Sequence, residues 1–274
     1  MPAEARTTRT PEPAPGLALD PLTRLARAHA TRAEMFTRAA ERVVRLDWGS
    51  AIFHDAFPRW PDLNTVRVEV PAPSLDADRL ERAVDRLQAR LPLQRVEVFD
   101  EATATRLVHD MDARGWWLQR SVLMGWNGGE PPPAPEVEEV PYAAVEKLRA
   151  EWLRSDGAAG DEEALAQGLA ADRLTFSRTP TRAFAAIRAG RPVAYGLLLD
   201  VGEIALVEDV YTTPEARGEG LGAAVVHRLV FEGQAGGHAD TVLATDAAGR
   251  ARGLYARLGF ARIGAVQRFL RRVA

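Results

Sequence analysis

Residues 214–223, Pro-Glu-Ala-Arg-Gly-Glu-Gly-Leu-Gly-Ala, place an arginine and three alternating glycines between an apolar run and an amphipathic helix. Gly218, Gly220 and Gly222 carry no Cβ atom, so a bound group can approach the main-chain amides closely. The start of a helix adds unpaired N–H donors and a partial positive charge. This segment therefore predicts a ligand that carries phosphate or pyrophosphate.

The sequence around this loop alternates strand and helix patterns from residue 136 to the C-terminus. Apolar runs and period-two alternation predict strands at 136–140, 184–187, 193–199, 203–212, 241–245 and 260–270. Apolar residues three and four positions apart predict helices through 145–152, at 162–171, directly after the loop, and at 251–258. Together these segments predict an α/β fold with mixed strand directions.

A stretch rich in glycine and proline, Asn127-Gly-Gly-Glu-Pro-Pro-Pro-Ala-Pro135, divides the chain into nearly equal halves. Such residues do not fit inside a helix or a central strand, so we expect a linker at 127–135. Residues 1–16 are rich in Pro, Ala, Thr and Glu without an apolar core, which predicts a disordered tail. The expected domains are therefore 17–126 and 136–274.

The two halves share the order of their predicted elements. The first half is expected to end with strand, helix, strand, helix and strand at 64–70, 80–91, 95–99, 101–114 and 116–124. The distance from Pro71 to Gly115 is 44 residues, and from Pro214 to Gly259 it is 45. A duplicated domain explains this agreement. The first copy has Ala-Pro-Ser-Leu-Asp-Ala-Asp at 72–78, without glycine, so we expect it to bind no phosphate.

The composition excludes several kinds of partner and chemistry. The 274 residues carry a net charge of −3, which favours neither nucleic acid nor an acidic membrane as a partner. There is no cysteine, and the five histidines lack metal-ligand spacing, so we expect no disulfide and no metal site. No apolar stretch reaches the ~20 residues of a membrane span, and residues 1–16 do not resemble a secretory signal. We expect a cytoplasmic monomer with an internal pseudo-dimer.

Three segments of the second half occur in a distinctive order: Val210-Tyr-Thr-Thr-Pro214, Arg217-Gly-Glu-Gly-Leu-Gly222 and Leu254-Tyr-Ala-Arg-Leu-Gly-Phe260. In order and spacing they resemble a fourth-strand end, a pyrophosphate loop and an L-Y-x-x-x-G-F segment of the GCN5-related N-acetyltransferase (GNAT) family. The first half resembles a degenerate copy of the same fold. The resemblance implies two tandem GNAT-like domains, each a mixed, mostly antiparallel sheet flanked by helices.

The resemblance to this family also implies a reaction and a cofactor site. The reaction is transfer of an acetyl group from acetyl-CoA, the co-substrate, to a primary amine by direct attack in a ternary complex. The strand before the glycine loop would separate from its neighbour, and the pantetheine arm would bond to the exposed backbone of Val210, Tyr211 and Thr212. The pyrophosphate would be held by Arg217 and by the amides of Gly218, Glu219, Gly220, Leu221 and Gly222.

Two acids and one tyrosine are the candidates for proton transfer. An amine arrives protonated, with a pKa near ~10, so a base or a water chain must remove a proton. Glu208 and Asp209 precede the cofactor segment, and strand alternation predicts that at most one of them lines the site. The family pattern favours Glu208 as the base. It also implies that Tyr255 protonates the departing thiolate, and Met111 occupies the aligned position in the first copy.

Two alternative functions remain open. Gly218-x-Gly220-x-x-Ala223 also satisfies the dinucleotide fingerprint of NAD-dependent oxidoreductases, although residues 212–217 separate the strand from the first glycine. A non-catalytic sensor or scaffold that binds acyl-CoA is the other alternative. The acceptor amine, a small molecule or a peptide, is not encoded in any recognisable motif.

Overall fold

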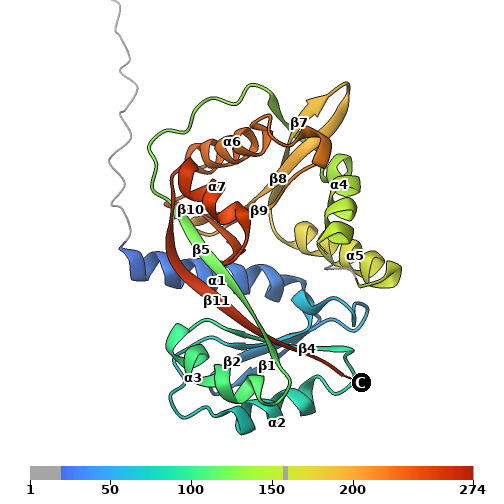
Figure 1. The fold of residues 1–274 in the computed structure, drawn as a ribbon, viewed down its shortest axis with the longest axis vertical. Coiled ribbons are helices and arrows are strands. Elements are labelled where there is room, and N and C mark those ends of the chain that lie inside the picture. The colour runs from blue at the N-terminus through green and yellow to red at the C-terminus, as the bar shows by residue number, and fades with distance from the viewer. Residues whose placement is uncertain (1–19, 157–159, 274) are drawn as a thin grey trace, which may run out of the picture.

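The structure, a computed structural model, describes residues 20–156 and 160–273 (Figure 1), so the tail predicted at 1–16 lies outside the described residues. The first half contains α1 (Pro21–Ala39), β1 (Arg42–Leu46), β2 (Gly49–Phe53), a 3-10 turn (Pro61–Leu63), β3 (Thr65–Val68), α2 (Ala77–Leu87), β4 (Leu93–Val98), α3 (Glu101–Asp112) and β5 (Trp117–Trp126). The second half contains β6 (Val137–Val140), α4 (Tyr142–Ser155), α5 (Glu162–Arg178), β7 (Thr181–Arg188), β8 (Arg191–Val201), β9 (Ile204–Thr212), a 3-10 turn (Pro214–Ala216), α6 (Leu221–Ala235), β10 (Asp240–Asp246), α7 (Arg250–Leu258) and β11 (Phe260–Arg272). None of the described helices is long and apolar enough to traverse a lipid bilayer.

The described strands form one continuous sheet in the order β1-β2-β3-β4-β11-β5-β10-β9-β8-β7-β6. Only the neighbours β3–β4 and β9–β10 run parallel, and every other neighbouring pair is antiparallel. Helices flank this sheet. The predicted α/β class, with a mixed and mostly antiparallel sheet, is therefore confirmed.

The centre of the sheet is built from two strands that the halves exchange. β5 ends the first half, yet its residues 121–125 pair with β10 of the second half. β11 ends the second half, and its residues 267–272 pair with β4 of the first half. β5 and β11 also pair with each other and form the long diagonal ribbon in Figure 1. The linker at 127–135 thus connects two parts of one sheet, and its role as a domain boundary remains a prediction.

The two halves repeat one topology. The order β1-β2-β3-α2-β4-α3-β5 recurs as β7-β8-β9-α6-β10-α7-β11. Two antiparallel pairs and then a parallel pair occur in each series. Gly115 and Gly259 both adopt a positive φ between the last helix and the last strand of their half. This agreement supports the predicted repeat.

Helices cover both faces of the strands in the second half. On one face, apolar residues of α6 form a core with Val207 of β9. On the other face, apolar residues of α4 and of α1 form a core with Leu206. The neighbours Leu206 and Val207 point to opposite faces, as the two-residue period of a strand requires. Because α1 belongs to the first half by sequence, this packing brings first-half side chains close to β9.

Candidate active site

The parallel strands β9 and β10 separate halfway along their length. Their pairing extends from Ile204 and Asp240 to Val207 and Leu243, after which β9 continues to Thr212. β8 pairs with the opposite edge of β9, and β5 pairs with the opposite edge of β10. Within the described strands, the edge of 208–212 that faces β10 therefore has no strand partner. The resemblance to the GNAT family implied such a separation before the glycine loop.

A β-bulge brings Glu208 and Asp209 to the same face of the sheet. The pairing of β9 with β8 shifts register at this point, and Asp209 has a φ of 56°. Leu206 and Tyr211 pack in one core although five positions separate them, so an extra residue lies between them. Both acids line one pocket. The prediction that at most one of them lines the site was wrong, because a bulge interrupts the alternation.

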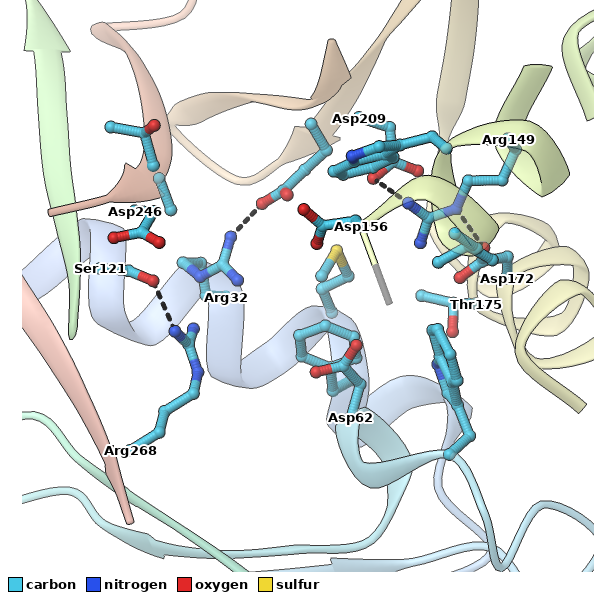
Figure 2. A pocket seen from close by; sticks show the side chains of 18 of the residues that line it. Arg32, Asp62, Ser121, Arg149, Asp156, Asp172, Thr175, Asp209, Asp246 and Arg268 are labelled. Carbon is cyan, nitrogen blue, oxygen red and sulfur yellow. Dashed lines mark hydrogen bonds and ion pairs between the residues drawn. The ribbon is translucent and has the colours of Figure 1, made fainter. Parts of the chain in front are cut away.

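A pocket of about 310 Å³ lies where β9 and β10 separate (Figure 2). Both halves of the chain contribute to its wall. Its charged residues are six acids, Asp62, Asp156, Asp172, Glu208, Asp209 and Asp246, and four arginines, Arg32, Arg95, Arg149 and Arg268. Its apolar residues include Met35, Phe36, Trp60, Trp152 and Phe176. The excess of acids suits a positively charged ligand such as a protonated amine.

Glu208 forms an ion pair with Arg32 of α1. The side chains of Glu208 and Arg32 are only 19% and 13% exposed, so water screens the pair weakly. Sequence reasoning missed Arg32. One arginine on an amphipathic helix carries no signal, and only the packing of α1 against the second half brings it to β9.

Asp209 belongs to a buried cluster with Arg149 and Asp172. Arg149 Nη1 donates to Asp209 Oδ1 at 3.0 Å, and its Nε donates to Asp172 Oδ2 at 2.7 Å. Burial raises the pKa of Asp209 to about 7, with Arg149 acting against this shift and Asp172 adding to it. Burial also raises the pKa of Asp172. One guanidinium does not neutralise two buried carboxylates, so this pair favours retaining a proton.

The glycine loop leads into α6, which covers the face opposite the pocket. Gly218 and Gly220 have φ angles of 88° and 80°, which residues with a Cβ atom rarely adopt. Gly220 caps α6 without a side-chain acceptor, whereas aspartate side chains cap α1, α2, α3 and α5. The first amides of α6 can therefore bind an external acceptor. Arg217 is exposed, and its Nε donates to the carbonyl oxygen of Thr212 at 3.1 Å.

Tyr255 of α7 lies in the core on the α6 side of the sheet. Its ring contacts Phe260 with 6.1 Å between the centroids. Burial, together with the negative charge of Glu208, raises the pKa of Tyr255 to about 12. The phenol therefore keeps its proton at neutral pH. The candidate acid and the candidate base come from opposite faces of the sheet, near the point where β9 and β10 separate.

The first half has no equivalent of this arrangement in its corresponding residues. Asp76 caps α2, the counterpart of α6, and its Oδ1 accepts from the amide of Arg79 at 2.7 Å. No glycine occurs at 72–78. Met111 is fully buried at the position that aligns with Tyr255. The open helix start and the phenol are both properties of the second half alone.

Residues 143–260 match the model of the acetyltransferase (GNAT) family. The chain contains a GNAT domain. The match includes the separated strands, the glycine loop and Tyr255, and it indicates N-acetyl transfer as the general activity of the GNAT domain. No curated protein matches the chain.

Solved structures with similar folds extend beyond the GNAT domain. A GCN5-related N-acetyltransferase from Kribbella flavida has a TM-score of 0.63 and 20% identity, over 95% of this chain and 98% of its own. A functionally unknown conserved protein from Staphylococcus epidermidis has a TM-score of 0.65 and 10% identity, over 86% of this chain and 95% of its own. At these identities the likeness concerns the fold alone. Both halves of the chain are thus part of an arrangement found in other proteins.

Proposed function

We propose that this protein transfers an acetyl group from acetyl-CoA to a primary amine by direct attack in a ternary complex. The observation that carries the proposal is the gap between β9 and β10. The open start of α6 follows β9 on one face of the sheet, and an acidic pocket lies on the other face where the two strands separate. A donor and an acceptor that enter from opposite faces would meet at this gap.

The residues on the α6 side fit the donor. Acetyl-CoA supplies an activated thioester and a pyrophosphate. In the proposal, the amides of Gly218, Glu219, Gly220, Leu221 and Gly222 bind the pyrophosphate, with Arg217 beside them. The free backbone edge of Val210, Tyr211 and Thr212 hydrogen-bonds the pantetheine arm as a strand would.

The residues near the gap suit the two proton transfers of the proposed reaction, from the amine and to the thiolate. The protonated amine loses a proton before attack, and we assign this proton to Glu208, with Asp209 as the alternative acceptor. The nitrogen–carbon bond forms as the carbon–sulfur bond breaks, and the nitrogen releases its second proton to solvent. Tyr255 gives its proton to the departing thiolate and regains one from solvent. The products are the N-acetylated amine and CoA with a free thiol.

The first half, in this proposal, is a non-catalytic copy that builds the acceptor side of the pocket. Its own helix α2 is capped by Asp76, and Met111 has no transferable proton. Its contribution to the site is Arg32 and the wall around Trp60.

Calorimetric titration and a thiol-release assay test the proposed function together. We expect acetyl-CoA to bind with micromolar-range affinity and NAD not to bind. Amines should then release free CoA from acetyl-CoA. Tyr255→Phe should lower turnover at least about tenfold while leaving acetyl-CoA affinity nearly unchanged, because the phenol acts only on the leaving thiolate. Absence of acetyl-CoA binding would refute the proposal, and binding without release would indicate a sensor or scaffold.

A further inference from the structure

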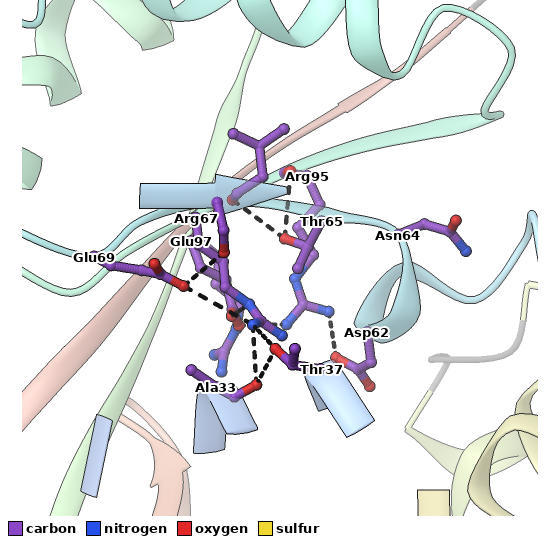
Figure 3. Close-up of polar contacts among 12 residues, drawn as sticks. Ala33, Thr37, Asp62, Asn64, Thr65, Arg67, Glu69, Arg95 and Glu97 are labelled. Carbon is purple, nitrogen blue, oxygen red and sulfur yellow. Dashed lines mark hydrogen bonds and ion pairs between the residues drawn. The ribbon is translucent and has the colours of Figure 1, made fainter. Parts of the chain in front are cut away.

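The four arginines of the pocket differ in how fully acids neutralise them. Arg95 donates to Asp62 and Glu97 and has its Nε buried (Figure 3). Arg149 lies between Asp172 and Asp209 and over the ring of Trp152 at 4.6 Å. A further carboxylate at either guanidinium would meet two acids already in place, so neither suits an anionic ligand.

Arg268 shares its acidic partner with other arginines. Its Nε donates to Glu97 at 2.7 Å and its Nη1 donates to Ser121 Oγ at 2.6 Å. Glu97 also accepts from Arg95, and Arg67 lies 4.0 Å away from it. Burial and the neighbouring Arg95 and Arg32 lower the pKa of Arg268. Nη2 of Arg268 has no hydrogen-bond partner among the described residues, and the acid on this side of the pocket is Asp246, which is exposed and lies beside Ser121 (Figure 2).

Arg32 is neutralised by Glu208, whose charge changes during the proposed reaction. Of its three nitrogens, only Nη1 has a hydrogen-bond partner among the described residues, and that partner is Glu208. When Glu208 takes a proton from the amine, Arg32 loses its hydrogen-bonded counter-ion, and the charges of Glu97 and Asp62 compensate it only in part, in a site where 13% of its side chain is exposed. An uncompensated charge in such a place is costly. A second anion near Arg32 would offset this cost.

We propose that the acceptor is an amine that also carries a carboxylate, with Arg32 and Arg268 binding the carboxylate and Glu208 facing the amine. This inference rests on the proposed function and names its substrate class. Both arginines line the pocket, where Figure 2 shows the Arg268 guanidinium directed toward Ser121 and the Arg32 guanidinium paired with Glu208. Charge-assisted hydrogen bonds from guanidinium to carboxylate are strong and directional.

The apolar part of the pocket wall favours an acceptor that has an apolar side group. Trp60, Trp152 and Phe36 also line the pocket. The volume of about 310 Å³ limits the acceptor to a small molecule or to one terminal residue of a peptide. An amino acid with an apolar side chain combines all three features.

Acceptors that differ only in the carboxylate test the proposal. We expect kcat/KM for L-phenylalanine to exceed that for L-phenylalaninamide and for phenethylamine by about tenfold or more, because the two arginines would otherwise lack their partner. Arg268→Gln should abolish this preference, and Arg268→Lys should restore part of it. Arg271→Gln is the matched control, since Arg271 pairs with Glu81 and Asp85 in the first half and should leave the preference intact.

A binding measurement covers the case in which none of these amines is turned over. With CoA present, 3-phenylpropanoate should bind the wild type at least about tenfold more tightly than 3-phenylpropanamide, and Arg268→Gln should remove the difference. Equal kcat/KM values, or equal affinities where nothing turns over, would overturn the carboxylate assignment. Such a result would leave the proposed function standing wherever simple amines still release CoA. Failure of acetyl-CoA to bind would instead refute the proposed function.

Discussion

At the scale of single residues, Asp209 and Glu208 show how neighbours with the same charge acquire different properties. Glu208 forms an ion pair with Arg32 at the pocket wall, and both side chains are partly exposed. Asp209 is inside the fold, shares Arg149 with Asp172, and has Oδ2 buried without a partner among the described residues. Burial therefore acts on Asp209 and sets its pKa at about 7. We infer that Asp209 mainly influences stability.

Asp209→Asn should flatten the dependence of folding stability on pH. Asp209 titrates near 3.8 when unfolded and near 7 when folded, so between these values the folded chain binds more protons. The free energy of unfolding then falls as the pH rises through this window and levels off above it. The variant should remove up to about 1.4 kcal/mol per pH unit of this slope. Urea unfolding from pH 4 to pH 8 measures it.

The exposed acid Asp47 provides the control for this experiment. Asp47→Asn should leave the slope of the wild type unchanged. Parallel curves for the wild type and Asp209→Asn would mean that Asp209 is ionised in the folded protein throughout the window.

At the scale of elements, the start of α6 has no capping side chain that competes with a ligand, unlike the aspartate-capped starts of α1, α2, α3 and α5. Gly220 occupies the cap with a φ of 80° and has open space where a Cβ would be. Gly237, just after the same helix, has a φ of 79° and the same open space. The two glycines have the same backbone requirement, and only Gly220 lies in the predicted phosphate loop.

Gly220→Ala and Gly237→Ala should separate stability from binding. Each should lower the free energy of unfolding by about 1–2 kcal/mol, because alanine resists a left-handed conformation. Only Gly220→Ala should weaken acetyl-CoA binding, by about tenfold, since the Cβ atom and any shift of the loop disturb the amides of the cradle. Thermal unfolding and calorimetric titration measure both effects. Equal losses of affinity would argue against a cradle at residues 218–222.

At the scale of the whole molecule, the exchanged strands make the two halves depend on each other. Phe269 of β11 is 1% exposed and packs in the core of the first half. Val122 and Met124 of β5 pack in a core of the second half. Each half thus completes its core with a strand from the other, so we expect the chain to unfold as one cooperative unit.

Phe269→Ala should destabilise both halves, although Phe269 contacts the core of only one. Removing a buried phenylalanine costs about 3–5 kcal/mol of unfolding free energy. Hydrogen exchange should become faster in β4 and in β9 alike, because both belong to one cooperative unit. Phe231→Ala, at a side chain that is 47% exposed, should change the free energy by less than about 1 kcal/mol. Faster exchange in β4 alone would show that the halves unfold independently.

Local patterns in the sequence were sufficient for most of the second half. The strand before the glycine loop, the helix after it and the turn at Gly259 depend on backbone requirements and apolar periodicity, which neighbouring residues set. Gly218 and Gly220 adopt a positive φ, a backbone conformation that glycine favours and residues with a Cβ atom rarely adopt. The repeat between the halves was also predictable, because the nearly equal spacing of corresponding residues can be read from the sequence.

Only the tertiary structure decided which chain segments meet. The exchange of β5 and β11, the bulge that turns Asp209 into the pocket, and the ion pair between Arg32 and Glu208 join residues far apart in sequence or break a local period. A periodic pattern records which face of a strand is buried, but not which strand lies beside it or where an extra residue shifts the register. The sequence by itself therefore determined the GNAT-like elements and the predicted phosphate loop, while long-range packing determined the pocket that both halves line.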